Sequence, residues 1–164
     1  MKTPKRILIM GLPGSGKTYF AERLKRYLED HVNPINEHSL RPIADARVTV
    51  TWLNADDIRT QYNDWDFSPE GRRRQAQRMR AVADKGCAAE FIMLCDFVCP
   101  TRELREIFDA DFTVWMDTIP KSKYKDTNAI FERPTEDEYD IRIDEFASDK
   151  WSETLADLIH MLLP

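Results

Sequence analysis

The sequence predicts an α/β protein, a three-layer α/β/α fold with a mainly parallel five-stranded sheet. Two observations predict this class. Short apolar runs alternate with helical patterns along the chain, which is typical of a parallel sheet with helices on both faces and right-handed crossovers. A glycine-rich turn, residues 11–18 (GLPGSGKT), joins the first apolar run to the first helical pattern. The carboxyl ends of the strands should therefore meet at one edge, where such sheets bind their ligands.

Five short apolar runs predict the strands. The runs are bounded by polar or turn-forming residues and are rich in β-branched and large apolar side chains, as buried parallel strands are. In chain order, the predicted strands are residues 5–10, 48–53, 88–95, 111–116 and 139–143.

Helical patterns separate these runs. The first predicted helix follows the glycine-rich turn, with Phe20 and Leu24 on its apolar face. The next is capped by Ser68 and runs to about Lys85, where Gly86 closes it. Two shorter helical patterns and three polar segments complete the prediction. The helices are expected at 101–108 and 148–163. Residues 32–46 are expected as a loop or an excursion, residues 54–67 as a polar stretch, and residues 119–137 as a mobile lid loop.

Size and composition predict one domain over residues 1–164, because 42% hydrophobic and 32% charged residues are the balance of a globular protein. No apolar run approaches the roughly 20 residues of a membrane span. The apolar stretch 7–10 is too short for a signal peptide, so we expect a cytoplasmic protein without a membrane partner. The net charge of −5 argues against an extended nucleic-acid surface. A homodimer is an open alternative.

The glycine-rich turn matches the phosphate-binding pattern G-x-x-x-x-G-K-[ST]. Its glycines let main-chain N–H groups point at phosphate oxygens, and the following helix offers its positive end to the same anion. We expect it to bind ATP, with Lys17 reaching the β- and γ-phosphates and Thr18 holding Mg²⁺. The predicted nucleotide-binding residues are Gly11, Pro13, Gly14, Ser15, Gly16, Lys17 and Thr18. This pattern predicts the P-loop NTPase type of fold, which serves switches, motors and kinases equally.

Three further segments favour a kinase. They are residues 53–59 (LNADDIR), 66–75 (DFSPEGRRRQ) and 98–102 (VCPTR). The order of these segments resembles that in the adenylylsulfate kinases, which phosphorylate the 3′-hydroxyl of adenosine 5′-phosphosulfate. The resemblance covers the chain from residue 5 to about residue 131. The family carries a leucine-Asp-Gly-Asp-x-x-Arg, a Gly-Phe-Ser-x-x-x-Arg-x-x-Asn and an Ile-Ser-Pro-x-Arg pattern at similar positions.

The resemblance implies an acceptor site. The positions at which the family binds its substrate are occupied here by Arg59, Arg72 and Gln75, with Gln75 in place of an asparagine. Phe67 falls where an aromatic ring stacks on the substrate adenine, and Phe131 corresponds to the opposing ring. Two arginines suit a compact phosphosulfate anion, and a phenylalanine offers a flat apolar face to a purine.

The remaining candidates are weighed against ordinary structural roles. Val98, Cys99 and Arg102 belong to the third segment, which implies contacts with the substrate, and Arg102 is expected at the substrate phosphates or the transferring group. Trp65 is either part of a second flap or ordinary packing. The further arginines 73, 74 and 80 are expected on a solvated helix face. All three cysteines, including Cys87 and Cys95, are expected as reduced thiols in or near a buried strand.

The chain departs from the family pattern at the end of the second strand, where Asn54 and Ala55 replace the first Asp-Gly and Asp56 remains. Asp96 ends the apolar run 91–95, the usual place of a Walker B aspartate in P-loop proteins. We therefore expect Asp96 to position Mg²⁺ together with Thr18, and Asp56 to act as base or orienter at the acceptor hydroxyl. The predicted catalytic residues are Lys17, Asp56 and Asp96. The structural alternative for Asp96 is a strand-end cap.

Three functions follow, in decreasing order. The first is a kinase of adenosine 5′-phosphosulfate or a similar nucleotide-like anion. The second is a P-loop kinase of another nucleotide, nucleoside, antibiotic or sugar, which the altered acceptor segments support. The third is a nucleotide-dependent switch. The sequence argues against it, because it has no Asn-Lys-x-Asp segment of the kind that recognises guanine.

Overall fold

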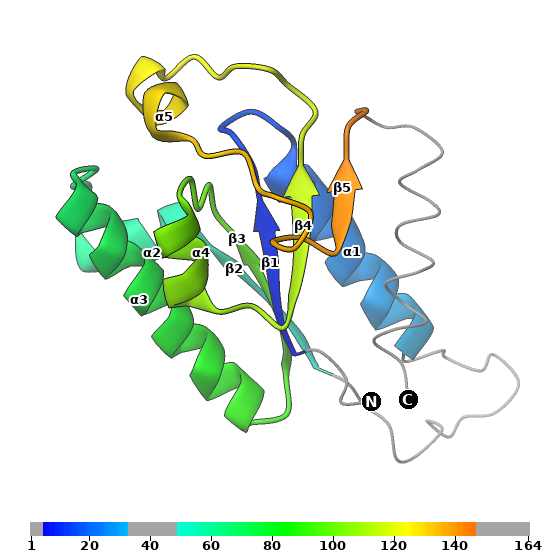
Figure 1. Cartoon of the computed structure of the whole chain (residues 1–164). Helices are drawn as coiled ribbons and strands as arrows, with labels where there is room; N and C mark the ends of the chain where they lie inside the picture. Colours follow the sequence, from blue (N-terminus) through cyan, green and yellow to red (C-terminus); the bar gives the residue numbers. More distant parts are fainter. Residues whose placement is uncertain (1–4, 33–48, 147–164) are drawn as a thin grey trace, which may run out of the picture.

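The structure, a computed structural model, describes residues 5–32 and 49–146 (Figure 1). The described elements follow one another as strands and helices in the predicted alternation. They are β1 (Arg6–Met10), α1 (Lys17–Val32), β2 (Val50–Asn54), α2 (Ala55–Tyr62), α3 (Pro69–Ala88), β3 (Ile92–Asp96), α4 (Arg102–Phe108), β4 (Phe112–Met116), α5 (Lys125–Ile130) and β5 (Ile141–Ile143). The closing helix predicted at 148–163 and the predicted loop beyond residue 32 lie outside the described residues.

The described strands form one sheet in the order β2-β3-β1-β4-β5, and every neighbouring pair is parallel. β1 is central, with β3 and β4 at its sides (Figure 1). The predicted parallel five-stranded sheet is thereby confirmed. Because the strands point the same way, the segments that follow β1, β2, β3 and β4 meet at one edge.

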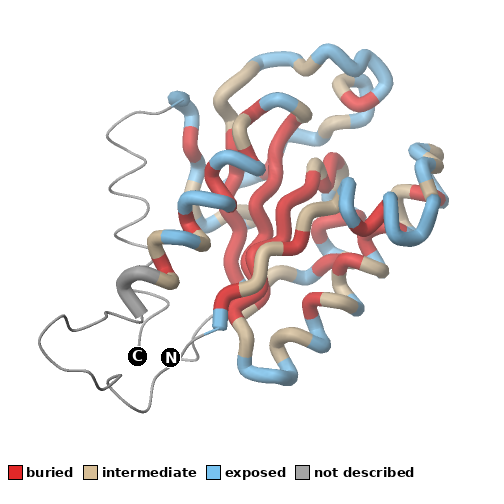
Figure 2. The backbone as a smooth tube through the Cα atoms, turned by 180° about the vertical axis from the view of Figure 1, so that it is seen from behind, coloured by how far each residue is buried: buried red, intermediate tan, exposed pale blue. Residues whose placement is uncertain are grey.

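The sheet has a buried core on each face, and the alternation of β1 decides which residue goes where. Ile7 and Ile9 pack on the face covered by α1, whereas Leu8 and Met10 pack on the face covered by α3 and α4. Figure 2 shows the helices buried along one side only, and the strands β1, β3 and β4 are buried throughout, whereas the edge strands β2 and β5 are partly exposed. Burying one large apolar side chain stabilises a fold by about 1.5–3 kcal/mol. Packing on both faces therefore fixes the turn that follows β1.

The boundary between α3 and β3 differs from the prediction. Ser68 caps α3 as predicted, since its Oγ accepts from the N–H of Gly71 at 3.2 Å. The helix then continues through Gly86 to Ala88, and β3 begins only at Ile92. A Cβ at Gly86 would overlap the Sδ of Met93, so this glycine lets α3 pass close to β3 rather than closing the helix. The chain turns at Glu90, whose φ of 65° is left-handed.

Two segments for which no helix was predicted, the polar stretch 54–67 and the loop 119–137, contain helices. α2 begins directly after Asn54, whose Oδ1 accepts from the N–H groups of Asp56 and Asp57 at 2.9 and 3.3 Å. α5 lies within residues 119–137, hereafter the lid segment. There Asn128 Nδ2 donates to the carbonyl of Ser122 at 2.8 Å. Side-chain caps of this kind stabilise short helices that lack a clear apolar period.

None of the described helices has the length and the apolar composition that crossing a bilayer would require.

Candidate active site

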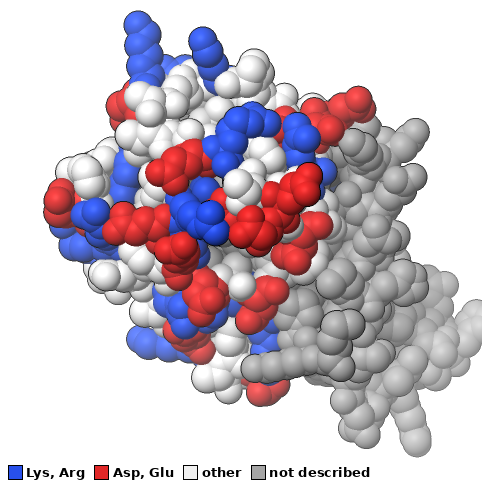
Figure 3. Space-filling model, in the orientation of Figure 1, with Lys and Arg blue, Asp and Glu red and all other residues white. Residues whose placement is uncertain are grey.

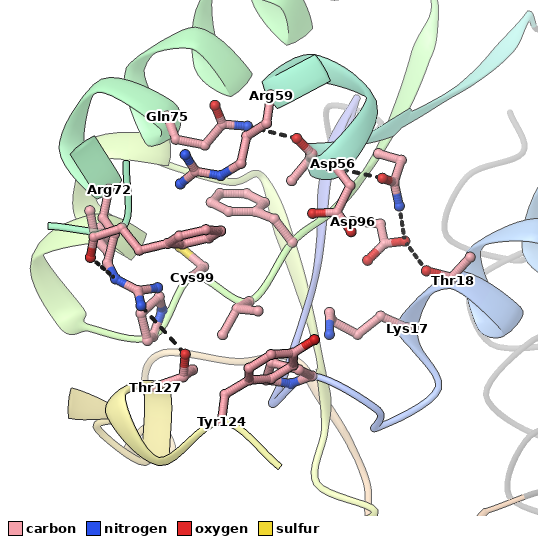
Figure 4. A pocket seen from close by; sticks show the side chains of 18 of the residues that line it. Lys17, Thr18, Asp56, Arg59, Arg72, Gln75, Asp96, Cys99, Tyr124 and Thr127 are labelled. Atoms are coloured by element: carbon pink, nitrogen blue, oxygen red, sulfur yellow. Dashed lines mark hydrogen bonds between the residues drawn. The ribbon is translucent and has the colours of Figure 1, made fainter. Parts of the chain in front are cut away.

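The main cavity lies at the carboxyl ends of β1, β2 and β3, as the parallel sheet predicts, and has a volume of about 510 Å³. This volume is within the range of small-molecule sites. Its walls come from the glycine-rich turn, α2, α3, the segment after β3 and the lid segment (Figure 4). Of the predicted site residues, it is lined by Pro13, Gly14, Lys17, Thr18, Asp56, Arg59, Phe67, Arg72, Gln75, Asp96, Val98 and Cys99.

The glycine-rich turn has the backbone that only glycine adopts easily. Gly11, Gly14 and Gly16 have φ values of 148°, 86° and 92°. A Cβ at Gly11 would overlap the carbonyl of Met116, and one at Gly16 would lie 2.6 Å from the ring of Phe146. Ser15 is fully buried, and its Oγ has no hydrogen-bond partner among the described residues. A curled turn with an unpaired buried hydroxyl, ahead of α1, fits a bound polyphosphate.

Lys17 is nearly buried, with 8% of its surface exposed, at the first position of α1. Its Nζ donates to the carbonyl of Leu12 at 3.1 Å, so the ammonium folds back over the turn. Burial lowers the pKa of Lys17 below its ordinary value, while Asp96 and Asp56 oppose that shift. The turn therefore holds a partly desolvated cation, which attracts a phosphate strongly because little water screens it.

Asp96 is the buried carboxylate of the cavity, with 2% of its surface exposed. Its Oδ2 accepts from Thr18 Oγ1 at 2.9 Å and from Asn54 Nδ2 at 3.0 Å (Figure 4). The parallel register places Asn54 directly beside Asp96. Burial raises the pKa of Asp96, whereas Lys17 and the two hydrogen bonds lower it. Asn54 therefore makes hydrogen bonds with both ends of its amide: Oδ1 caps α2, and Nδ2 donates to the carboxylate of Asp96.

Thr18 and Asp96 present adjacent oxygens of the type that Mg²⁺ prefers. Among residues 5–32 and 49–146, no group of three or more His, Cys, Asp or Glu side chains could hold a metal alone. This fits Mg²⁺, which is usually bound by one or two protein oxygens together with substrate phosphates and water.

Arg59, Phe67 and Arg72 form the opposite wall of the cavity. The guanidinium of Arg59 lies 4.5 Å from the centre of the Phe67 ring, and that of Arg72 lies 5.4 Å from it. Arg59 is buried and donates to the carbonyls of Asp64 and Asp66 at 2.9 and 3.1 Å. Arg72 Nε donates to the carbonyl of Phe67 at 2.9 Å. The loop between α2 and α3 is therefore tied to both arginines.

Two further predicted residues act on the shape of the cavity. Gln75 is buried, and its Nε2 donates to the carbonyl of Ala55 at 2.9 Å, which ties α3 to the start of α2. Cys99 has a φ of 44°, and its carbonyl accepts from Arg105 Nη1 at 3.3 Å. Burial raises the pKa of the Cys99 thiol well above its ordinary value, so the thiol is protonated and packs as a small apolar group.

Two of the predicted substrate-binding residues lie outside the main cavity. Phe131 packs against the core on the α3 and α4 face and lines a second, smaller cavity between β4 and the lid segment. Arg102 is exposed, and its guanidinium bonds Glu106 and Asp137 at 3.3 and 3.2 Å. Phe131 does not line the main cavity, because the lid segment turns back toward β4 after α5 (Figure 1), and Arg102 does not line it either.

Sequence reasoning missed Tyr124, which lines the main cavity from the lid segment and is 47% exposed. An aromatic residue in a polar lid was the available signal. Trp65 also lines the cavity and is 50% exposed, which contradicts ordinary buried packing. Asp126 and Thr127 of α5 complete the wall beside Arg72.

The other arginines of α3 are neutralised by carboxylates. Arg73 bonds Glu103 at 2.6 Å, and Arg74 bonds Asp66 at 2.9 Å. Arg80 bonds Asp109 at 3.0 Å. Figure 3 shows basic and acidic side chains intermixed on this face. The predicted solvated helix face is thus a network of ion pairs, and it offers no uniform basic surface to a nucleic-acid backbone.

The comparisons with known proteins agree with this architecture. Residues 3–136 match the family model of adenylylsulphate kinase. The comparison with curated proteins gave no match. The structure of the Mycobacterium tuberculosis APS kinase in complex with AMPPNP and APS superimposes with a TM-score of 0.73 and 20% identity, covering 99% of this chain and 100% of that one.

Two other solved structures extend the comparison. A mutant of the same mycobacterial kinase gives a TM-score of 0.69 and 21% identity, with 99% and 100% of the two chains covered. A gluconokinase from Sinorhizobium meliloti 1021 gives 0.56 and 15%, with 99% and 93% covered. At these identities the likeness shows a common fold.

Proposed function

The chain belongs to the adenylylsulphate kinase family and is a P-loop kinase, and on that premise we propose that it transfers the γ-phosphoryl group of ATP to a hydroxyl of a small nucleotide-like anion. The leading candidate acceptor is adenosine 5′-phosphosulfate, phosphorylated at its 3′-hydroxyl. One observation carries the proposal. A single cavity joins a phosphate-binding turn, with Lys17, to a wall made of two arginines and Phe67.

The donor side binds and orients the polyphosphate. Main-chain N–H groups of residues 11–18 surround the β- and γ-phosphates, and the start of α1 adds its positive end. Lys17 neutralises the charge that develops on the transferring group and on the leaving oxygen. Such preorganised groups supply most of the catalysis in phosphoryl transfer, because the protein has little covalent chemistry to do.

Thr18 and Asp96 would hold Mg²⁺, with Asn54 keeping the carboxylate oriented. When bound, the ion neutralises the negative charge on the β- and γ-phosphate oxygens. Asp56 lines the same cavity at the start of α2, and its charge acts on both Lys17 and Asp96. In this proposal Asp56 orients the acceptor hydroxyl or accepts its proton.

The acceptor side recognises an anion and a flat ring. Arg59 and Arg72 bind the anionic group through charge-assisted hydrogen bonds, and Phe67 stacks on the base. Tyr124 replaces Phe131 as the aromatic residue that faces the base from the lid segment. The lid segment covers the cavity and excludes water, which would otherwise take the phosphoryl group.

The test is an acceptor panel. The purified protein is incubated with ATP, Mg²⁺ and adenosine 5′-phosphosulfate, and the 3′-phosphorylated product is measured by chromatography. We expect Phe67→Ala to raise the KM for this acceptor about tenfold, as expected for loss of one base-stacking ring. Tyr62→Ala is the matched control, since Tyr62 is an exposed aromatic residue that does not line the main cavity. Absence of product with wild-type protein overturns the leading candidate.

A second candidate keeps the kinase chemistry and changes the acceptor to another nucleotide, a nucleoside, an antibiotic or a sugar. Its neutral acceptors, such as a nucleoside or a sugar, are favoured by Asp126, because a carboxylate on the acceptor side of the cavity repels an anion. Including AMP, adenosine and simple sugars in the panel separates the candidates. ADP release that depends on one of these acceptors, and not on adenosine 5′-phosphosulfate, would establish the second.

A further inference from the structure

The lid segment contacts the acceptor wall at the guanidinium of Arg72. Thr127 Oγ1 accepts from Arg72 Nη2 at 3.4 Å (Figure 4). The carboxylate of Asp126 lies 3.5 Å from the same nitrogen. Both lid residues belong to α5, whereas Arg72 belongs to the first turn of α3. The contact therefore bridges the mouth of the main cavity.

Arg72 is held on its other side by the loop before α3. Its Nε donates to the carbonyl of Phe67 at 2.9 Å, so the contacts described engage Nε and Nη2. Its side chain is only 10% exposed, and burial is the largest influence on its pKa, which it lowers, while Asp126 opposes that shift. A desolvated guanidinium binds an anion more strongly than an exposed one does.

The contact between Asp126 and Arg72 is weak by its own geometry. At 3.5 Å it is an ion pair rather than a short charge-assisted hydrogen bond, which would measure about 2.7–2.9 Å. The Asp126 side chain is 69% exposed, so water screens it. An anion with two oxygens in the plane of the guanidinium would bind Arg72 better than this carboxylate does.

We propose that Asp126 competes with the anionic group of the acceptor for Arg72, and thereby sets how strongly the enzyme prefers anionic over neutral acceptors. The inference rests on the proposed function, because it takes the main cavity to be the acceptor site. The acceptor anion displaces the carboxylate from Nη2, and Thr127 remains as the lid contact with the acceptor wall. Selectivity by charge is then a property of α5 as well as of the two arginines.

The test compares wild-type protein with Asp126→Asn, which keeps the size of the side chain and removes its charge. With the glycine-rich turn saturated by ADP, calorimetry measures the Kd of adenosine 5′-phosphosulfate, AMP and adenosine. We expect the Kd of both anions to fall about fivefold, in keeping with a partly exposed ion pair, and that of adenosine to stay unchanged. An unchanged or raised Kd for the anions, or an equal gain for adenosine, overturns the proposal.

The matched control is Asp137→Asn. Asp137 is a lid carboxylate that is also 69% exposed and also paired with an arginine, Arg102, but it does not line the main cavity. We expect its anion affinities to equal those of wild type. A gain as large as that of Asp126→Asn would assign the effect to the net charge of the lid and overturn the proposal.

A double-mutant cycle with Arg72→Ala isolates the competition. In that background Asp126→Asn should change the Kd of the anions by less than twofold, because the contested group is gone. Persistence of the full gain overturns the proposal. If the acceptor is not adenosine 5′-phosphosulfate, the Kd of pyrophosphate, measured with the turn saturated by ADP, tests the same competition between Asp126 and an anion for Arg72. Failure of the proposed function is then distinguishable from failure of this inference.

Discussion

Asn54 ends β2, Asp96 ends the neighbouring strand β3, and the two side chains lie next to each other. The register of β2 and β3 puts them side by side, and the amide of Asn54 donates to Asp96 at 3.0 Å. An aspartate at position 54 could still cap α2, but it could not donate to a second carboxylate. One acid and one amide are therefore what this pair of positions accommodates in the described geometry.

We predict that Asn54→Asp lowers kcat roughly tenfold to hundredfold, because a carboxylate at the half-buried position 54 would lie at hydrogen-bond distance from the buried carboxylate of Asp96 and repel it. Steady-state kinetics with saturating ATP measures the change. The exchange variant, Asn54→Asp with Asp96→Asn, restores the acid-and-amide pair and should recover part of the loss. An exchange variant no better than Asn54→Asp alone would contradict the pairing.

The raised pKa of Asp96 also predicts how the stability of the protein depends on pH. Because burial raises its pKa, the folded protein binds its proton more tightly than the unfolded chain does. The stability contributed by this group is present below the ordinary pKa of an aspartic acid and is lost as pH rises through the higher folded pKa. Asp96→Asn, which can still accept both hydrogen bonds, should therefore have a higher Tm than wild type at pH 8 in metal-free buffer.

The pH dependence supplies the check on that prediction. The Tm advantage of Asp96→Asn should shrink between pH 8 and pH 5, since part of the wild-type population regains the proton. Scanning calorimetry at both values measures it. An advantage that does not change with pH would mean that Asp96 acts through packing rather than through its charge.

At the scale of elements, the approach of α3 to β3 depends on Gly86. Alanine would favour the helix by about 0.8–1.0 kcal/mol over glycine. Its Cβ would, however, overlap the Sδ of Met93, which is buried in the core. Overpacking of a core costs about 1–3 kcal/mol, so the clash outweighs the propensity.

We predict that Gly86→Ala lowers the free energy of unfolding by about 1 kcal/mol, the difference between those two effects. A urea melt measures it, provided that the slope with denaturant is unchanged. Gly86→Ala combined with Met93→Val removes the closest overlap, that with Sδ, so the double variant should lose less stability than the two single variants together. Simple additivity would show that the two side chains do not meet.

At the scale of the whole molecule, a bound nucleotide should stabilise the folded state. The glycine-rich turn joins β1 to α1, and the carbonyl of Ser15 accepts from Thr118 Oγ1 after β4 at 2.7 Å. A ligand that binds there therefore orders the turn between β1 and α1, which is itself hydrogen-bonded to the segment after β4. It binds the folded state and not the unfolded chain, so it must raise the stability of the whole fold.

We predict that ADP at one hundred times its Kd stabilises the protein by about 2.7 kcal/mol. For a chain of this length that corresponds to a rise in Tm of about 5–11 °C. Differential scanning fluorimetry measures the shift, and Lys17→Ala, which removes the buried ammonium of the turn, should lose most of it. A wild-type Tm that does not respond to ADP would contradict nucleotide binding at residues 11–18.

Local patterns in the sequence determined the architecture. The alternation of apolar runs and helical patterns predicted the parallel sheet, and residues 11–18 predicted the turn after β1, because both depend on residues close together in the chain. The ordered segments after β2 and β3 indicated the kinase family. Where local signals were weak or ambiguous, α2 and α5 were missed, and the end of α3 was placed too early.

Only the tertiary structure decided which side chains meet in the cavity. Asn54 reaches Asp96 because β2 and β3 are neighbours in register, and Tyr124 rather than Phe131 faces the cavity because the lid segment turns back after α5. The contacts of Asp126 and Thr127 with Arg72 likewise join residues more than fifty positions apart. Contacts of this kind depend on strand order and on how a lid lies over a sheet, and neither is encoded in the spacing of residues along the chain.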